Sequence, residues 1–295
     1  MKDALSMTTH QAGSECRVTA LVIAILAIAC SADAQTRKAP PPSVRLYVFD
    51  CGVLDIPDTS NYQLKKEELA SSRMAVPCYL IAHPKGTLAW DSGVIPDSSF
   101  RPGGHTPLRY ATATKSLTAQ LAEIGYAPAD ITYLALSHFH WDHIGNANLF
   151  APTATWLVRK AERDIMFTDP PSPRTEPAHY SGLKTAKTVI ISSGEHDVFG
   201  DGTVVLKSAP GHSPDHLVLL VKLAKTGPLL LSGDLYHYPE ELKFNKVPTT
   251  EFNVAQTVAS RADVDAFLKK TGAQLWIQHD FTANAKLKKS PQFYD

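Results

Sequence analysis

The chain consists mostly of short apolar runs of strand type, separated by turns, with a few longer runs of helical spacing. Two β-rich stretches come first, at 44–54 and 76–93. Helical spacing occurs at 116–125, at 160–167 and in a long amphipathic segment, 254–272, which ends in glycine. The remaining strand-like runs lie at 131–137, 153–158, 188–192, 202–210, 216–223, 227–234 and 273–280.

The order of these runs predicts the fold class. A β-rich half and a helix are followed by alternating strands and helices, then by a second β-rich half, a helix and a last strand. This order favours an α/β architecture with two sheets packed face to face and helices outside, a four-layer arrangement. The segments 96–112 and 168–182 are rich in proline, glycine and small polar residues, and we expect them to be loops.

The N-terminus differs from the rest of the pattern. Residues 18–29 form an apolar run that is preceded by Arg17 and followed by Ala32-Asp33-Ala34, a small-x-small cleavage pattern. A membrane span needs about 20 apolar residues, so this run is too short for stable membrane insertion. We therefore expect a signal peptide, residues 1–34, and a periplasmic or secreted protein.

Cleavage after Ala34 would leave a proline-rich tether, 35–43, and a single domain, 44–295. A lipoprotein anchored through Cys30 is the weaker alternative, because the residues before Cys30 fit the lipidation pattern poorly. Basic and acidic residues each number 29 in the whole chain, and no basic run is present. A near-neutral chain of this kind lacks the positive surface that binds a nucleic-acid backbone, so we expect no nucleic-acid partner.

Two cysteines, Cys51 and Cys78, lie beyond the predicted signal peptide. Both occur in apolar strand-like stretches, which favours two separate buried residues. An oxidising compartment would also permit a disulfide between them, and the sequence leaves this alternative open. No Cys-x-x-Cys spacing occurs, which excludes a cysteine metal site.

Candidate chemistry is concentrated directly after the strand predicted at 131–137. The sequence there, SHFHWDHIGN, places His138, His140, Asp142 and His143 within six positions. Imidazole and carboxylate groups are the ligands that zinc and similar divalent metals prefer, and a strand end can aim them at one point. The cluster therefore predicts a metal site that holds one or two ions.

Three later stretches offer further ligands, each at a strand end or turn. They are GHSPDH with His212, LSGDLYH with Asp234 and QHD with His279. Taken singly, each residue has an ordinary structural explanation, as a turn residue, a cap at a strand end or a core histidine. Their joint occurrence after the histidine cluster favours metal binding.

These motifs, in this order, resemble those of the metallo-β-lactamase superfamily, whose fold is the four-layer αβ/βα sandwich. The resemblance extends over about residues 44–290. Within the superfamily, the stretches RLYVFDCGVL and VPCYLIAHPKGTLAWDSGV are most similar to the N-acyl homoserine lactone lactonases, the quorum-quenching enzymes. The activity that the resemblance implies is metal-dependent hydrolysis of a small-molecule lactone or ester.

The resemblance also implies a centre of two Zn²⁺ ions, with Fe, Co or Mn as alternatives. A hydroxide shared by the ions would attack the ester carbonyl, and Asp142 would orient it or accept its proton. Asp91 would support a metal-bound histidine from behind, and His216 would have a supporting or structural role. The implied ligands are His138, His140 and His212 for one ion, Asp142, His143 and His279 for the other, and Asp234 as the bridge.

One position departs from the family pattern. Lactonases of this group carry a tyrosine three residues after the bridging aspartate, where it hydrogen-bonds the substrate carbonyl. Here the residue is His237, flanked by Tyr236 and Tyr238, so we expect His237 or Tyr236 to take that catalytic role. Asp215 also replaces a common glycine. The change at position 237 bears on the identity of the substrate more than on the hydrolytic chemistry.

Other functions are compatible with the same motifs. A metallo-β-lactamase is one, but such enzymes usually have serine or cysteine at the position of Asp234. Organophosphate or aryl-ester hydrolysis is another, and iron-dependent redox chemistry and non-catalytic metal binding are more distant alternatives. The sequence does not fix the acyl-chain preference, the native metal or the oligomeric state, and a homodimer stays open.

Overall fold

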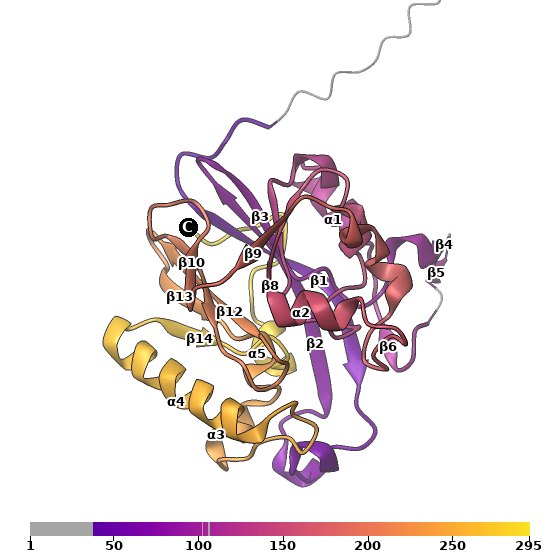
Figure 1. Ribbon diagram of the computed structural model, residues 1–295, viewed down its shortest axis with the longest axis vertical. Coiled ribbons are helices and arrows are strands. Elements are labelled where there is room, and N and C mark those ends of the chain that lie inside the picture. Colours follow the sequence, from indigo (N-terminus) through magenta and orange to yellow (C-terminus); the bar gives the residue numbers. More distant parts are fainter. Residues whose placement is uncertain (1–37, 102, 106) are drawn as a thin grey trace, which may run out of the picture. The chain divides into compact units, whose positions relative to one another are not determined.

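The computed structural model describes residues 38–101, 103–105 and 107–295, and Figure 1 shows their path. The signal peptide predicted at 1–34 lies outside the described residues. The described part of the predicted tether forms neither helix nor strand, and the Lys38 ammonium lies over the Tyr126 ring. Among the described residues, no helix has the length and apolar character that crossing a membrane requires.

The larger of two main sheets has seven strands in the order β6-β1-β2-β3-β7-β8-β9. Neighbours are antiparallel from β6 to β3 and parallel from β3 to β9. Its strands are β1 (Arg45–Asp55), β2 (Arg73–His83), β3 (Gly86–Trp90), β6 (Ala111–Thr112), β7 (Tyr133–Ala135), β8 (Thr155–Arg159) and β9 (Thr188–Ile191).

The second sheet has five strands in the order β10-β11-β12-β13-β14. All its neighbours are antiparallel except β13 and β14, which are parallel and therefore end at the same edge. A short ribbon of β4 (Phe100–Arg101) and β5 (Gly104–His105) lies in a segment predicted as loop. The strands of the second sheet are β10 (Glu195–Asp197), β11 (Val204–Ser208), β12 (Leu217–Leu223), β13 (Gly227–Leu231) and β14 (Gln274–Trp276).

Helices cover the outer faces of the sheets. Figure 1 shows α1 (Leu117–Glu123) beside the seven-stranded sheet and α4 (Val254–Thr271) beside the five-stranded sheet. α2 (Lys160–Met166) packs next to β8. Two short helices, α3 (Pro239–Lys243) and α5 (Phe281–Asn284), were not predicted, because each spans only about one turn of chain.

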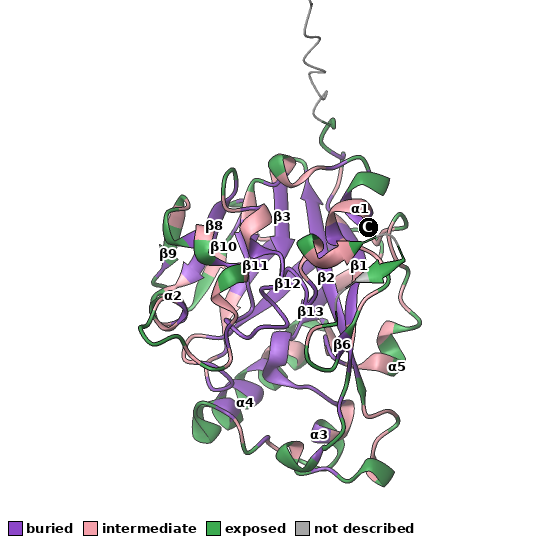
Figure 2. Cartoon of the chain, turned by 90° about the vertical axis from the view of Figure 1, so that its right-hand side faces the viewer, coloured by how far each residue is buried: buried purple, intermediate pink, exposed green. Residues whose placement is uncertain are grey.

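Three hydrophobic clusters define the layers, and Figure 2 shows that the central strands, such as β2, β3 and β12, are largely buried. The predicted four-layer αβ/βα sandwich is therefore confirmed. Between the two sheets lie Leu46, Val48, Leu88, Trp90, Val204, Leu219 and Leu231. Between the larger sheet and its helices lie Leu80, Leu121, Leu134, Trp156 and Met166. Between the smaller sheet and α4 lie Val218, Leu220, Leu230, Val264 and Leu268.

The long helix α4 is not amphipathic in the predicted way. Val254 is 47% exposed, whereas polar residues occupy much of the buried face. Ser260 donates to the Pro210 carbonyl at 2.6 Å, and Arg261 Nε donates to the Leu235 carbonyl at 2.9 Å. The helix thus holds the loops that follow β11 and β13. Its buried residues are Thr257, Ser260, Arg261 and Val264.

Cys51 and Cys78 form a disulfide between β1 and β2, so the favoured interpretation of two separate residues is wrong. The strand register pairs Phe49 with Cys78, and Cys51 follows Phe49 by two residues, on the same face of the sheet. A break in the register between Asp50 and Val53 accompanies this pairing. The bond depends on the register of β1 against β2, which composition alone does not record.

Candidate metal centre

The seven predicted ligands come together beyond the C-terminal ends of four strands. Four of them follow β7, and His212, Asp234 and His279 follow β11, β13 and β14. Because β13 and β14 are parallel neighbours, Asp234 and His279 emerge at the same edge. We call His138, His140, His212 and Asp234 the first ligand group, and Asp142, His143, His279 and Asp234 the second ligand group.

In the first ligand group, three imidazole rings face one another. His140 Nδ1 lies 2.8 Å from His138 Nε2 and 2.9 Å from His212 Nε2. Burial lowers the pKa of His138 and His140 well below the usual value, so both rings are neutral. Nitrogen lone pairs directed at one point repel one another unless a cation or proton lies between them.

Asp234 connects the two groups through its two oxygens. Oδ1 lies 3.0 Å from His143 Nε2 and 3.1 Å from His279 Nε2, whereas Oδ2 lies 3.3 Å from His212 Nε2. Asp142 Oδ2 completes the second group at 3.5 Å from His279 Nε2. Burial alone would raise the pKa of Asp234, but His143 and His279 hold it well below its usual range.

The residues of both groups fit divalent metal ions. His143 Nε2 and Asp234 Oδ1 are fully buried and lie 3.0 Å apart, but neither has the geometry of a hydrogen bond to any described residue. Unsatisfied buried polar atoms are rare and costly, and an ion between these two would satisfy both. Imidazole nitrogen and carboxylate oxygen in groups of four match the usual ligand set of zinc.

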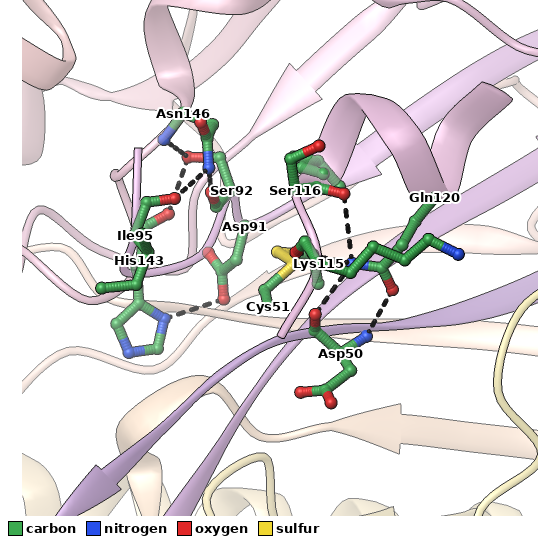
Figure 3. The surroundings of a disulfide bond; sticks show 12 residues. Asp50, Cys51, Asp91, Ser92, Ile95, Lys115, Ser116, Gln120, His143 and Asn146 are labelled. Atoms are coloured by element: carbon green, nitrogen blue, oxygen red, sulfur yellow. Dashed lines mark hydrogen bonds and ion pairs between the residues drawn. A yellow bond between two sulfur atoms is a disulfide. The ribbon is translucent and has the colours of Figure 1, made fainter. Parts of the chain in front are cut away.

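Asp91 fixes the orientation of His143 in the second ligand group. Figure 3 shows its carboxylate pointing at the His143 ring, and Oδ2 lies 2.9 Å from Nδ1. The same carboxylate accepts from Ser137 N at 2.6 Å and from Gln278 Nε2 at 2.8 Å. Held in this way at Nδ1, the His143 ring presents Nε2 to the ligand group.

The disulfide lies beneath the turn that carries Asp91. Ser92 N donates to the His143 carbonyl at 2.8 Å, and Gly145 N donates to the Gly93 carbonyl at 2.7 Å. A Cβ on Gly93 would lie 2.7 Å from Cys51 Cβ, so the turn is packed directly on the disulfide. The link between β1 and β2 therefore supports, through this turn, the aspartate that holds His143 (Figure 3).

The first ligand group is supported by side chains from a different part of the chain. His212 Nδ1 lies 3.0 Å from Glu251 Oε1, and Thr257 Oγ1 donates to Glu251 Oε2 at 2.5 Å. Burial opposes ionisation of Glu251, but His212 lowers its pKa to about 2. The carboxylate thus holds His212 with Nε2 facing the group.

His216 supports the bridging residue and is not among the ligands. Its Nε2 accepts from Asp234 N at 2.9 Å, and its Nδ1 donates to the Ala209 carbonyl at 3.1 Å. Burial lowers the pKa of His216 to about 3. Gly233 has φ +50°, and a Cβ there would lie 2.6 Å from His216 Nε2, so the close approach requires glycine.

Glu162 and Asp215 connect the ligand loops to α2. Glu162 accepts from Phe139 N at 3.1 Å and from Asp215 N at 2.9 Å, and so ties the loop after β7 to the loop after β11. Asp215 accepts from Arg159 Nε at 3.0 Å and from Ala161 N at 2.9 Å. The aspartate that replaces a common glycine therefore fastens the His212 loop to the first turn of α2.

Of the two residues expected to replace the family tyrosine, only His237 faces the centre. Its Nε2 lies 3.4 Å from Asp234 Oδ2, and its Nδ1 lies 3.2 Å from Glu241 Oε1. Burial disfavours the charged ring, but Glu241 and Asp234 together raise the pKa of His237 to about 10. Tyr236 instead packs against Arg261 in the cluster under α4 and does not face the ligand groups.

A cavity of about 220 Å³ opens onto the ligand groups. Its wall includes residues that the sequence analysis did not single out, notably Tyr62 and Arg174. Neither has a local sequence signal, whereas Gln278, also missed, stands directly before His279. Besides the ligands, the lining consists of Leu54, Ile56, Tyr62, Met74, Tyr110, Trp141, Arg174, His237 and Thr250.

Comparison with known proteins agrees with this geometry. A family model of the metallo-beta-lactamase superfamily matches residues 72–277. The chain belongs to this superfamily. An N-acyl homoserine lactonase, AttM, of Azorhizobium caulinodans is 30% identical over 270 residues, which are 85% of this chain and 99% of the relative. The superfamily predicted from the sequence motifs is confirmed.

Two solved structures show the same fold. A quorum-quenching N-acyl homoserine lactone lactonase has a TM-score of 0.69 at 24% identity, with 85% of this chain and 98% of that chain covered. AidC, a dizinc quorum-quenching lactonase, has a TM-score of 0.60 at 20% identity, with 88% and 95% covered. The predicted enzyme class, a metal-dependent hydrolase, is that of these relatives.

Proposed function

We propose that the protein is an exported dinuclear zinc hydrolase that opens the lactone ring of N-acyl homoserine lactones or related lactones. The observation that carries the proposal is the pair of ligand groups sharing Asp234 beside a cavity with apolar and aromatic walls. The lactonase AttM, at 30% identity, supports the substrate class, and the fold shared with AidC supports two zinc ions.

The residues of the chain have distinct tasks in this reaction. When bound, the two zinc ions supply Lewis acidity toward the attacking water and the ester carbonyl. The Asp142 carboxylate lines the cavity, where it accepts the proton of the attacking water. Glu241 holds His237 through Nδ1, so that Nε2 faces the cavity and can donate to a substrate oxygen.

The walls of the cavity suit an amphipathic lactone. Leu54, Ile56 and Met74 provide an apolar surface for an acyl chain. The Tyr62 ring lies 5.0 Å from the His237 ring, between centroids, and brings a phenol to the wall that the family tyrosine would otherwise occupy. The wall therefore offers both polar and apolar groups to such a substrate.

The proposal of export rests on two features of the chain. The apolar run at 18–29 with its small-residue cleavage pattern is typical of a signal peptide. The Cys51–Cys78 disulfide is the kind of bond that forms and persists in an oxidising compartment such as the periplasm. Detection of the mature protein in the periplasmic or culture fraction, beginning at Gln35, would test this part of the proposal.

Proton release tests the catalytic part directly, because opening a lactone by hydrolysis yields a carboxylic acid. Zinc-loaded protein is mixed with a long-chain N-acyl homoserine lactone, a cephalosporin or an aryl ester in weak buffer. We expect rapid acid release with the lactone from the wild type and none above background from Asp234→Ala. Turnover of the cephalosporin or aryl ester without turnover of the lactone would overturn the substrate assignment.

A further inference from the structure

Arg174 stands out among the residues that line the cavity, because its guanidinium has no acidic partner. Among the residues that the structure describes it forms no ion pair, whereas nearby Arg109 pairs with Glu176 at 3.8 Å. Arg174 Nη2 donates to the Thr250 carbonyl at 2.6 Å. A cation held without a counter-charge at a cavity wall is available to a ligand.

The backbone around Arg174 is also fixed against the metal centre. Its carbonyl accepts from Trp141 N at 2.9 Å, which attaches the proline-rich segment to the histidine run. The side chain is therefore anchored at the backbone and at Nη2, and Nη1 remains directed at His140. An anchored guanidinium loses little further freedom when it binds a substrate oxygen.

Arg174 Nη1 lies 3.4 Å from His140 Nε2, on the side of the ring opposite the ligand group. If His140 holds zinc through Nδ1, the neutral ring carries its proton on Nε2. An N–H of His140 then points toward the N–H groups of Arg174, and neither can accept from the other. An oxygen acceptor placed beside both nitrogens would accept a hydrogen bond from each.

We infer that Arg174 Nη1 and His140 Nε2 form a two-donor site for the amide carbonyl oxygen of an N-acyl lactone. The inference rests on the proposed function and specifies which part of the substrate is recognised. The ester carbonyl must reach the ligand side of His140, where Nδ1 lies. The site at Nε2 lies one imidazole-ring width away from the position of the ester carbonyl. In an α-acylamino lactone, the amide carbonyl is only a few bonds away from the ester carbonyl, which corresponds to this separation.

A substrate pair separates amide recognition from general effects on the centre. One substrate is N-hexanoyl homoserine lactone, and the other is an alkyl γ-lactone of similar length without an amide. Arg174→Met should lower kcat/KM for the N-acyl lactone by about 10- to 100-fold, which is the usual contribution of hydrogen bonds to a charged donor. For the alkyl lactone the change should stay within about threefold, since that substrate offers no amide oxygen.

Two variants and a binding measurement accompany this comparison. Arg174→Lys keeps the charge but loses the planar pair of donors, so it should recover only part of the effect. Arg163→Met removes an arginine that packs on Phe167, away from the cavity lining, and should change kcat/KM for neither substrate. Calorimetry should show that Arg174→Met weakens binding of the ring-opened N-hexanoyl homoserine but not of a 4-hydroxyalkanoate, with zinc content unchanged.

The outcomes distinguish the inference from the function on which it rests. Equal loss on both lactones, or no loss on either, would overturn amide recognition while leaving the lactonase proposal intact. If Arg174 instead bound the carboxylate of the ring-opened product, kcat/KM would fall equally for both lactones, because both products contain a carboxylate. A wild type that opened neither lactone would overturn the proposed function and the inference together.

Discussion

The two ligand groups share Asp234, but different parts of the molecule support them. The second group is supported from the sheets: Asp91 follows β3, Gln278 follows β14, and His279 Nδ1 donates to the Ala75 carbonyl of β2 at 2.7 Å. The first group is supported from a loop, since Glu251, which holds His212, lies between α3 and α4. The second ligand group is therefore held by residues at the ends of paired strands, and the first ligand group is held from a loop.

This difference predicts that the two halves bind metal with different strength. Strands that pair over many residues are the most stable parts of a fold, whereas connecting loops open more readily. The second ligand group should therefore hold the tighter of the two zinc ions that we propose. A zinc titration should therefore show two steps, a tighter and a looser one. Variants that weaken supports in the sheets should affect the tighter step, and variants that weaken supports in the loops should affect the looser step.

Removal of the disulfide should have the largest effect on stability. The bond closes a loop of 27 residues between Cys51 and Cys78, and loop-closure entropy for that length corresponds to about 3.5 kcal/mol. The double variant Cys51→Ala/Cys78→Ala should lose roughly that much free energy of unfolding. Urea unfolding of the zinc-free protein measures it.

The difference between the two ligand groups leads to a more specific expectation for the same double variant. Because the disulfide packs against the turn that carries Asp91, its loss should weaken the tighter zinc step more than the weaker one. Wild type unfolded in the presence of reductant serves as the control and should match the double variant. Equal weakening of both zinc steps would show that the disulfide does not act through that turn.

Asp91→Asn should have the next largest effect. The Asp91 Oδ2 atom accepts from His143 Nδ1, Gln278 Nε2 and Ser137 Oγ, and Oδ1 accepts from Ser137 N. An asparagine must place its NH₂ against one of these donor sets, whichever way its amide is turned. We expect the tighter zinc step to weaken by about 100-fold, or about 2.7 kcal/mol, as for the loss of residues that orient metal ligands.

Competition with a chelator of known zinc affinity, followed by metal analysis, measures this change. Asp97→Asn provides a matched control, since Asp97 is a structural aspartate near the same turn that caps α1 through Leu117 N. That control should leave both zinc steps unchanged. If Asp91→Asn weakened the looser step instead, the assignment of the tighter ion to the second group would be wrong.

The sequence predicted the parts of this centre that depend on local pattern. The run from His138 to His143 directly follows a short apolar strand, and each later ligand also follows an apolar run, so strand ends could be recognised from hydrophobic spacing alone. The order of strands and helices was sufficient for the four-layer fold.

The residues that hold the ligands in place depend on contacts between distant segments, which no local sequence pattern reveals. Asp91 meets Ser137 because β3 and β7 are parallel neighbours, and Cys51 meets Cys78 because of the register of β1 against β2. Glu251 reaches His212 from a loop 39 residues later in the chain. The first half of the buried face of α4 is polar because Thr257, Ser260 and Arg261 bind loops around the centre, which departs from the hydrophobic pattern expected of a helix over a sheet.

Glu251→Gln should have the smallest effect of the three. A glutamine keeps an oxygen that can accept from His212 Nδ1, and the Thr257 hydroxyl can rotate to accept from the new NH₂, so only the charge is lost. The looser zinc step should weaken by about 10-fold, or about 1.4 kcal/mol, with the tighter step unchanged. Glu251→Ala, which also removes the oxygen acceptor, should weaken that step further. If Glu251→Gln and Asp91→Asn weakened the same zinc step, the two ligand groups would respond as one unit. The difference between support from the sheets and support from the loops would then have no consequence for metal binding.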